Sequence, residues 1–436
     1  MKKSKLKVNS WNFIPKSKKY SIQELNNKKN LNFSSSKTYL AHGMGRSYGD
    51  VCLNNNGEII LTENYKKIIN FDIENGYIEC ESGLTIKQLL EFIVPKGWFL
   101  PVVPGTSYVT IGGAVANDIH GKNHHIAGSF GNFVEEFKLI TSKRKVFVCS
   151  LTENSELFKA TIGGLGLTGL ILSVKIKLIK INNEFIQTSV KRFYTFDQYL
   201  QLNKSLSQRY EYTVSWIDFN LKNNKKKLKG VYIYGNHSKD KVKKSKKFKY
   251  KLAVPFRPPF SIVNNFTINL INLIYFYLNK SDISKLQHYK SFFFPLDTIS
   301  NWNKAYGNRG FYQYQFVVPE EHAGEVLDQV YLNLKKYNQR VCLGVLKSFG
   351  DIQSCGIMSF PRKGITLALD LQNKGPKTLE LLTELDRIVL NNLGNIYPAK
   401  DARMSREVFN KINPRLKEFK NFIDPKFNSS FKNRVF

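Results

Sequence analysis

The spacing of hydrophobic residues divides the first part of the chain into short strands with few helices between them. Six segments have the composition and alternation of β-strands: residues 38–41, 58–62, 77–81, 133–141, 145–148 and 170–180. Residues 85–94 have the spacing of an amphipathic helix, which Thr85 can cap at its start. Residues 155–160 predict a further short helix before the last of these strands.

The pattern changes near residues 182–184, after which strands and helices mix without the regular alternation of a parallel sheet. Strands are predicted at residues 211–219, 311–318, 342–347 and 365–371, and helices at 196–206, 320–337 and 379–390. We therefore predict an α+β fold whose second region is built on an antiparallel sheet.

Two of these strands carry unusual side chains on one face. Gln313 and Gln315 share a face because side chains alternate along a strand. Polar side chains on a face expected to be buried predict a sheet that lines a polar cavity. Trp216 shares a face with Asp218 in the strand at 211–219.

Two glycine-rich stretches in the first region are candidates for ligand binding. Residues 42–50 read HGMGRSYGD, and residues 104–125 read PGTSYVTIGGAVANDIHGKNHH. Glycines let a backbone approach a ligand and direct its N–H groups at phosphate oxygens, and Arg46 can pair with a phosphate. A flavin or nicotinamide cofactor running between the two stretches fits this pattern.

The motifs expected for other ligands or reactions are missing. A GxxxxGK[ST] loop for ATP, an HExxH zinc motif and a GxSxG nucleophile elbow are all missing from the sequence. The spacing of His120, His124 and His125 does not fit one helical metal-binding face, so a zinc site is a minor alternative and we predict no metal. Residues 164–169 match GxGxxG, but a helix precedes them and a strand follows, the reverse of the dinucleotide-binding order. They predict a close-packed turn.

The composition indicates a folded protein. The positive charge indicates either an anionic partner or a coding bias toward basic residues. The 436 residues are 42% hydrophobic and carry a net charge of +32. The five cysteines form no CxxC pair, and the lysine-rich N-terminus lacks the apolar stretch of a signal peptide, so we predict a cytoplasmic protein. A non-enzymatic binder of RNA or lipid is the alternative from another class; no RNA-binding signature accompanies the charge, and nucleic acid is not predicted as a partner.

One stretch of the second region is both basic and apolar. Residues 222–251 are rich in lysine, and residues 256–278 are apolar and aromatic. Four asparagines within the apolar part argue against a transmembrane helix. Two interpretations stay open: a surface that touches the inner face of an anionic membrane, or a buried helix preceded by a solvated lysine loop.

A family resemblance extends over most of the chain. The segments GRSYGD, LPVVPGT, TIGGAVANDIHGKNHHIAGSFGN and ELFKATIGGLGLTG, together with the later HYKSFFFPLD and YPAKDAR, resemble the FAD-dependent oxidases of the vanillyl-alcohol oxidase type, which have a PCMH-type FAD-binding domain. The resemblance implies a two-subdomain FAD-binding domain at residues 1–183, a substrate-binding domain at 184–394 and a segment, 395–436, that returns to the FAD domain.

The same resemblance implies which residues hold FAD. Backbone groups of the two glycine-rich loops would wrap the pyrophosphate, and Asn117 to His120 would lie along the flavin. The implied cofactor-binding residues are Gly43, Gly45, Arg46, Ser47, Tyr48, Gly49, Gly105, Thr106, Thr110, Gly112, Gly113, Asn117, Ile119, His120, Ile171 and Tyr397. Many members attach FAD through a histidine in the first loop. Tyr48 stands at that position here, so non-covalent FAD is expected.

The implied chemistry is the oxidation of a sugar hydroxyl, at C2 of a polyprenyl-phosphate-linked pentose, by hydride transfer to flavin N5. Lys400 matches a lysine that offsets negative charge on the flavin, and His120 and Lys122 line the site. Trp216, Gln313, Gln315 and Lys347 match residues around the substrate. A short-chain reductase that completes an epimerisation is an implied partner. An aldonolactone or sugar-alcohol oxidase that uses oxygen is the alternative.

Two departures from the resembled pattern concern the substrate. Phe293 stands where near members have an active-site tyrosine, while Ala368 and Thr366 replace a pocket cysteine and an asparagine. They bear on the identity of the sugar and its lipid carrier.

Overall fold

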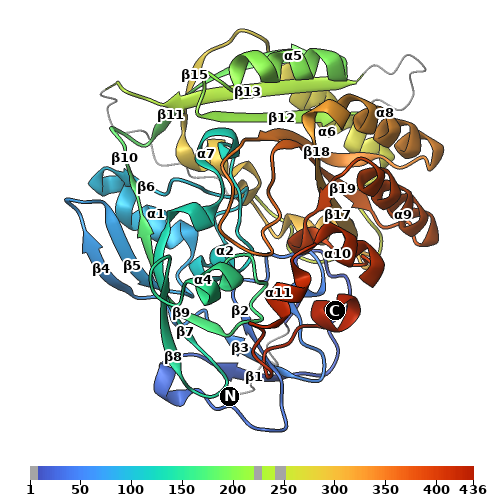
Figure 1. Ribbon diagram of the computed structural model, residues 1–436. Coiled ribbons are helices and arrows are strands. Elements are labelled where there is room, and N and C mark those ends of the chain that lie inside the picture. Colours follow the sequence, from blue (N-terminus) through green and yellow to red (C-terminus); the bar gives the residue numbers. More distant parts are fainter. Residues whose placement is uncertain (1–7, 220–227, 241–251) are drawn as a thin grey trace.

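The computed structural model describes residues 8–219, 228–240 and 252–436 (Figure 1). Most of the lysine-rich run predicted at 222–251 therefore lies outside the described residues. Three main sheets organise the chain, one parallel and two antiparallel. The mixture of helices with antiparallel sheets confirms the predicted fold class.

The described part of the first region contains two main sheets and four α-helices. A parallel sheet has the order β1 (Ser21–Glu24), β3 (Glu58–Leu61), β2 (Tyr39–His42). An antiparallel sheet has the order β4 (Ile68–Asp72), β5 (Tyr77–Glu81), β9 (Leu170–Lys177), β7 (Val134–Ile140), β8 (Val146–Ser150). The helices are α1 (Ile86–Ile93), α2 (Ile111–Ala116), α3 (His124–Ala127) and α4 (Ser155–Thr161). Thr85 caps α1 through a reciprocal capping box with Gln88, as its position before the apolar run predicted.

The second region is built on an antiparallel sheet of eight strands. Their order is β15 (Lys285–His288), β11 (Phe185–Phe193), β13 (Lys229–His237), β12 (Tyr212–Asp218), β18 (Val341–Phe349), β19 (Gly364–Gln372), β17 (Phe311–Val318), β20 (Asn395–Ile396). The helices α5 (Phe196–Leu206), α8 (Glu320–Lys336) and α9 (Pro376–Asn391) contribute to the hydrophobic core that covers one face.

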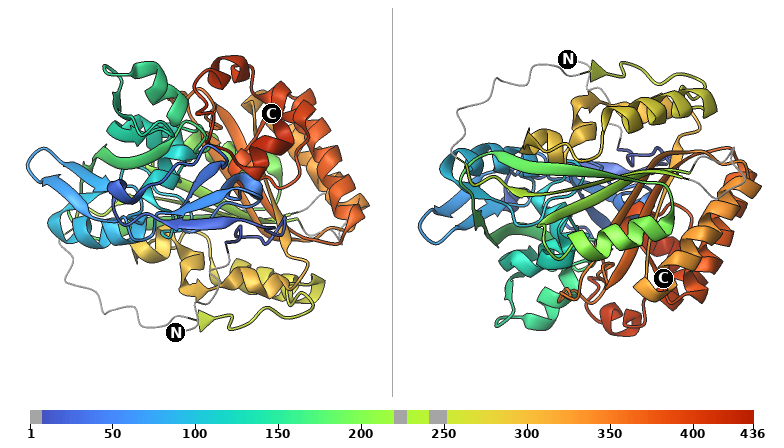
Figure 2. Two further views of the ribbon diagram at one scale, coloured as in Figure 1. Left: turned by 90° about the horizontal axis from the view of Figure 1, so that it is seen from below. Right: turned by 90° about the horizontal axis from the view of Figure 1, so that it is seen from above.

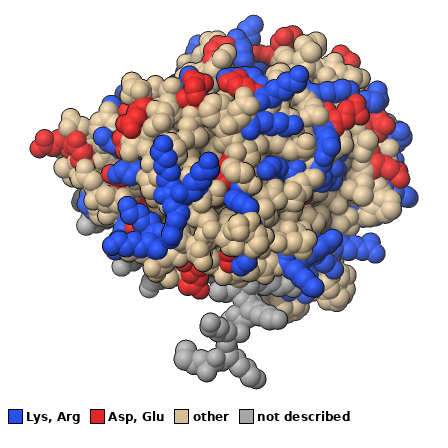
Figure 3. Space-filling model, turned by 60° about the horizontal axis from the view of Figure 1, so that its bottom comes forward, with Lys and Arg blue, Asp and Glu red and all other residues tan. Residues whose placement is uncertain are grey.

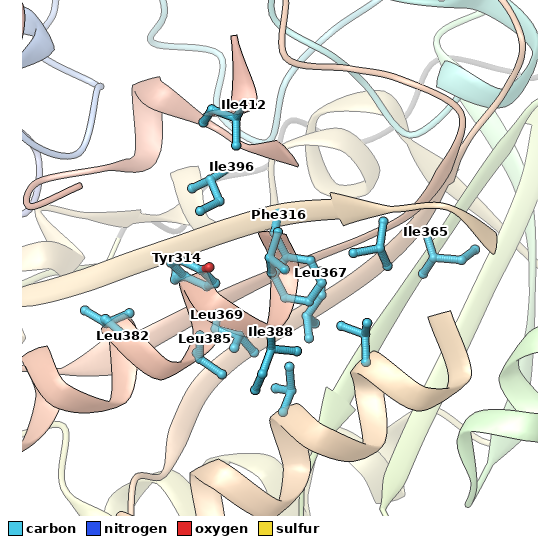
Figure 4. Close-up of a cluster of buried hydrophobic side chains, with 14 of the residues drawn as sticks. Tyr314, Phe316, Ile365, Leu367, Leu369, Leu382, Leu385, Ile388, Ile396 and Ile412 are labelled. Atoms are coloured by element: carbon cyan, nitrogen blue, oxygen red, sulfur yellow. The ribbon is translucent and has the colours of Figure 1, made fainter. Parts of the chain in front are cut away.

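Side chains alternate along each strand, so the two faces of this sheet carry different residues. Tyr314 and Phe316 of β17 point into the hydrophobic core, where they meet Leu367 and Leu369 of β19 and side chains of α9 (Figure 4). The intervening Gln313 and Gln315 point the other way and are buried as well. The register pairs Gln315 with Ala368 and Gln313 with Asp370, so these four residues share the second face.

The remaining elements connect the regions and cover their edges. They are β6 (Trp98–Phe99) with β10 (Ile179–Lys180), β14 (Leu252–Ala253) with β16 (Ile299–Ser300), α6 (Asn265–Leu278), α7 (Tyr289–Phe293), and the C-terminal α10 (Arg406–Ile412), α11 (Leu416–Lys420) and α12 (Ser430–Val435). Among the helices of the described residues, none has the length and apolar character needed to cross a membrane.

The C-terminal segment contacts both regions. Tyr39 of β2 exchanges backbone hydrogen bonds with the tail, donating to Lys426 O at 2.7 Å and accepting from Asn428 N at 2.9 Å. Phe409 and Phe431 belong to the core of the second region, and β20 extends its large sheet beside β17. The predicted domain boundaries at 183 and 394 stay a prediction.

Candidate active site

A cavity of about 570 Å³ lies between the first region and the polar face of the large sheet. Its lining includes nearly all residues predicted to bind cofactor or substrate: Gly43, Gly45, Arg46, Ser47, Tyr48, Gly105, Thr106, Thr110, Gly112, Gly113, Asn117, Ile119, His120, Ile171, Gln313, Gln315, Lys347, Tyr397 and Lys400. Segments almost 360 residues apart in sequence, from Gly43 to Lys400, therefore meet at one site.

The wall from the first region is built largely of backbone. The loop at 43–49 follows β2, and a second loop at 104–110 leads into α2, which Thr110 caps by accepting a hydrogen bond from Gly113 N at 3.2 Å. The two loops touch at Gly43, where a Cβ would lie 2.4 Å from Thr110 Oγ1. Only glycine permits this approach, so Gly43 determines how closely the two loops pack.

Several polar groups of this wall lack partners within the described part of the chain. Arg46 Nε, Ser82 Oγ and Asn117 Oδ1 are buried without a hydrogen bond, and all three residues line the cavity. The backbone N–H groups of residues 44–47 donate to no described acceptor. A buried polar group costs free energy unless a partner satisfies it. A cofactor rich in phosphate and ring acceptors, such as FAD, therefore fits this wall.

The opposite wall is built of side chains from the large sheet. Gln315 Nε2 lies 2.9 Å from His120 Nε2 and 3.2 Å from Thr366 Oγ1, and Gln313 donates a hydrogen bond to Asp370. Lys347 Nζ lies 3.0 Å from His120 Nδ1. These contacts confirm that the shared face of 311–318 lines a polar cavity.

Burial and neighbouring lysines set the protonation of His120 and Lys347. The pKa of His120 is held well below 6.5, first by burial and then by the charge of Lys347. Burial lowers the pKa of Lys347 to about 7, with Lys122 and Lys400 adding repulsion. At neutral pH His120 is thus an uncharged imidazole, and it lies beside lysines whose own pKa values are lowered toward neutrality.

Lys400 enters the cavity from the short 3₁₀ turn Pro398–Lys400. Its Nζ lies 4.1 Å from the centroid of the Tyr48 ring, and the hydrogen bond from Tyr48 N to Ala399 O (2.9 Å) holds the two segments together. Burial lowers the pKa of Lys400 to about 8, while the carboxylate of Asp370 acts to raise it. The same environment raises the pKa of Asp370 to about 6, again chiefly through burial.

An ion-pair bridge fixes the loop of Tyr48 against the loop of Lys400. Arg434 of α12 binds Asp50 at 2.7 Å and Asp401 at 2.9 Å, and each aspartate is close in sequence to one of the two site residues. Gly49 lies at the contact between the loops with φ of 120°, and a Cβ there would be 1.8 Å from Asp401 O. Gly49 does not line the cavity. A glycine is needed at this position because the two loops pack closely, not because a ligand contacts it.

Lys122 and Trp216 are also outside the cavity lining. Lys122 Nζ donates to Phe293 O at 3.0 Å, and burial lowers its pKa to about 8. Trp216 lies on the same face of the sheet as the cavity, because it pairs with Val345, but its ring packs against Tyr275 of α6 at a centroid distance of 4.8 Å. The predicted direct role of Trp216 in closing the pocket is therefore not seen in the geometry.

The two further histidines of the cluster pack structurally. His124 packs against Phe349 with the rings tilted and a centroid distance of 4.3 Å, and His125 Nε2 lies 2.9 Å from Tyr210 O. The described residues contain no group of three acidic, histidine or cysteine side chains that could hold a metal ion.

Some residues of the cavity were missed by the sequence pattern. Gly166 and Gly169, at the GxGxxG match, line it, although a helix (α4) precedes and a strand (β9) follows as predicted. The stretch predicted as a close-packed turn thus also contributes backbone to the cavity. Trp11 and Asp297 also line it, and Asp297 accepts hydrogen bonds from Thr106 and Ser107. Asp370, which contacts Gln313, carried no signal of its own in the sequence.

Comparisons with known proteins agree with this arrangement. Residues 29–150 match the family model described as FAD binding domain. Decaprenylphosphoryl-beta-D-ribose oxidase of Mycolicibacterium smegmatis is 34% identical over 399 residues, which cover 88% of this chain and 86% of that protein. The chain belongs to this family of FAD-dependent oxidoreductases. It is thus an oxidoreductase with FAD as its cofactor.

Other members of the family match less of the chain. An uncharacterized protein in the mprA 5′ region of Streptomyces coelicolor is 27% identical over 359 residues, 78% of this chain and 96% of its own length. L-gulonolactone oxidase of the shark Scyliorhinus torazame is 29% identical over 160 residues, only 36% of this chain and 34% of its own. The similarity to the lactone oxidase is therefore partial.

Proposed function

We propose that this FAD-dependent oxidoreductase oxidises the C2 hydroxyl of a pentose linked through phosphate to a polyprenyl lipid. The observation that carries the proposal is the wall of Gln313, Gln315, Lys347 and Lys400 facing the glycine loops across one cavity. Two amides and two cations suit the hydroxyls and phosphate of a sugar phosphate. The likeness to an oxidase of lipid-linked ribose, over most of both chains, supports the same substrate class.

The roles of the residues follow from their chemistry. Bound FAD supplies the acceptor for the hydride that leaves C2. Neutral His120 accepts the proton of the C2 hydroxyl, so that the alcohol loses two electrons and two hydrogens and becomes a ketone. Gln315, which contacts His120, orients the sugar, and Lys347 faces its phosphate. Lys400 contributes a fixed positive charge beside the cofactor.

FAD is held without a covalent bond in this proposal. Tyr48 occupies the place of the attaching histidine, and its ring lies under Lys400 instead. Acid precipitation would release the yellow flavin into the supernatant; flavin that stays in the pellet would contradict non-covalent binding.

The product determines which further partner we expect. A 2-keto sugar can be reduced at the same carbon from the opposite side, so a separate short-chain reductase would complete an epimerisation. We also propose that the enzyme acts at the inner face of the plasma membrane, where its lipid-linked substrate would be held.

An anaerobic titration tests the function. We expect the flavin absorbance, at roughly 450 nm, to bleach when a polyprenyl-phosphoryl pentose with a short, water-soluble prenyl chain is added. An aldonolactone or a free sugar alcohol should leave it unchanged. Bleaching by the soluble sugars alone, with peroxide released in air, would overturn the proposal in favour of a lactone or sugar-alcohol oxidase.

A further inference from the structure

Helix α6 exposes an apolar face that no described element covers. Its buried side chains Ile268, Asn272 and Phe276 hold it against the molecule. The remaining surface carries Phe266, Ile274 and Leu278, which are 50–76% exposed, with further aliphatic side chains between them. A surface helix normally turns polar residues to water, so a contiguous face of this kind marks an interaction site.

The chain before the helix extends the same surface. Leu252, Phe256 and Phe260 are 68–72% exposed. Between residues 252 and 280 the sequence contains no Asp or Glu, and its only charged residues are Arg257 and Lys280. We refer to residues 252–280 as the apolar patch. It lies at the outer edge of the molecule in both views of Figure 2, where α6 is the helix coloured yellow-olive.

Basic side chains border the apolar patch. Besides Arg257 and Lys280, Lys285 is exposed directly after it, and Lys304 Nζ donates to Pro255 O at 3.3 Å. The acidic Asp282 nearby is paired with Lys191. Positive charge is spread over the protein surface, as the face in Figure 3 shows, so charge alone would not locate a partner. An exposed apolar face with a basic border is more specific, because it matches acyl chains below anionic headgroups.

The apolar patch adjoins residues that line the cavity. β14, at its start, pairs with β16, and both Ile299 and Ser300 of β16 line the cavity. Further along, Ile262 N donates to Ala305 O at 2.8 Å, in the same short 3₁₀ helix (Trp302–Tyr306) as the cavity-lining Trp302. From α6 itself, Phe276 packs in the same cluster as Leu343, which lines the cavity from the sheet. A surface that rested on the patch would thus lie close to these cavity-lining residues.

We propose that residues 252–280 dock the enzyme on an anionic phospholipid bilayer, with α6 lying in the headgroup layer, so that a membrane-anchored substrate reaches the cavity without leaving the lipid. This inference rests on the proposed lipid-linked substrate. A helix of 14 residues is about 21 Å long, too short to cross the hydrocarbon core of about 30 Å, so it lies on the membrane.

Charge favours a lipid surface over a second copy of the chain. In a two-fold dimer through the apolar patch, the same surface of both copies meets itself. Arg257, Lys280 and Lys285 of the two copies would then lie close together without acidic partners from the patch. An anionic bilayer supplies the opposite charge instead.

Vesicle flotation tests the docking surface. Intact holoenzyme is mixed with vesicles of phosphatidylcholine alone or of phosphatidylcholine and phosphatidylglycerol at 7:3. We expect it to float with the anionic vesicles, and Phe266→Ser/Ile274→Ser/Leu278→Ser to bind them at least about tenfold more weakly. The matched control is Ile69→Ser/Leu151→Ser/Leu393→Ser, which replaces three similarly exposed apolar side chains on other elements and should float like the wild type. Visible spectra confirm that both triple variants keep FAD.

The outcomes separate this inference from the proposed function. Equal flotation of the wild type and the α6 variant, or no flotation of the wild type, would overturn the docking surface. So would a wild-type dimer in gel filtration that the α6 variant converts to monomer while neither binds vesicles. The α6 variant should oxidise a soluble short-chain substrate at the wild-type rate and the vesicle-embedded one about tenfold more slowly. If neither protein oxidises any substrate, the proposed function fails, and flotation still decides the docking surface.

Discussion

The two walls of the cavity are built by different means. The wall from the first region, with the loops at 43–49 and 104–110, presents backbone groups and glycines. The wall from the large sheet presents amide and ammonium groups from β17 and β18, and the carboxylate of Asp370 on β19 accepts a hydrogen bond from one of the amides. Backbone N–H groups are the same whatever the side chains, so they suit a cofactor shared by many enzymes, whereas side chains can change with the substrate.

The two walls also differ in their charge balance. In the sheet wall, Asp370 lies between Gln313 and the positive charge of Lys400, and Lys347 is held by His120. Each ionisable group there has its pKa shifted chiefly by burial. Shifted pKa values cluster where proteins carry out proton transfer or bind charge. The groups of the sheet wall meet His120 of the first region, whose pKa is also lowered by burial, so the proposed chemistry lies where the two walls join.

The largest effect is expected at Lys400. Lys400→Met keeps the volume of the side chain and removes its charge, so turnover should fall by about 100- to 1,000-fold while FAD stays bound. Stopped-flow bleaching gives the rate, and the ratio of flavin to protein absorbance gives the FAD content. Lys411→Met, at an exposed lysine of α10, is the control. A variant that turns over at the wild-type rate would remove Lys400 from the mechanism.

The backbone wall is tested at Gly105. A Cβ added there meets no described atom within 4 Å, and Gly105 lines the cavity, so an alanine would occupy only space open to the cofactor. Gly105→Ala should keep the stability of the apoprotein and raise the Kd for FAD about tenfold, because FAD must then shift from the backbone. Flavin fluorescence titration of the apoprotein measures this, with Gly324→Ala on α8 as the control. An unchanged Kd would mean that FAD does not approach this loop.

The sequence predicted the features that depend on one short segment alone. The glycines of 43–49 and 104–113, the alternation that places Gln313 beside Gln315, and the cap at Thr85 are all local features, and each has the predicted structure. Lys400 came from the resemblance rather than from any pattern. The cavity contains it because β20 pairs with β17 and Tyr48 N donates a hydrogen bond to Ala399 O, next to Lys400.

The local sequence did not predict the features that depend on how strands pair. Asp370 stands in the apolar run ITLALDLQ, and its place opposite Gln313 follows from the pairing of β17 with β19, 57 residues apart in sequence. The bridge from Arg434 to Asp50 spans 384 residues. No spacing rule predicts such contacts, because they arise from how elements pack rather than from their periods.

The charge balance of the sheet wall is tested at Asp370. Its carboxylate raises the pKa of Lys400, which burial alone would lower further. Lys400 is a cation only below its pKa, so activity should fall as pH rises through about 8. Asp370→Asn should move this fall about one pH unit lower and reduce activity severalfold at pH 8, with little change at pH 6. The pH profile of kcat measures it, with exposed Asp282→Asn as the control. A fall at the same pH would assign the titration to another group.

The smallest effect on activity is expected at Trp216, which tests where the sheet wall ends. Its ring packs on Tyr275 and Phe276 of α6 rather than lining the cavity. Trp216→Phe should leave kcat and KM for a soluble substrate within about twofold and lower Tm by about 2 °C, since a smaller ring buries less apolar area. Thermal unfolding and steady-state kinetics on one preparation measure both effects. The matched variant is Gln315→Met, a change of similar size on the same face, which should reduce kcat/KM while leaving Tm nearly unchanged. A strong loss of kcat with unchanged Tm in Trp216→Phe would extend the substrate wall to β12.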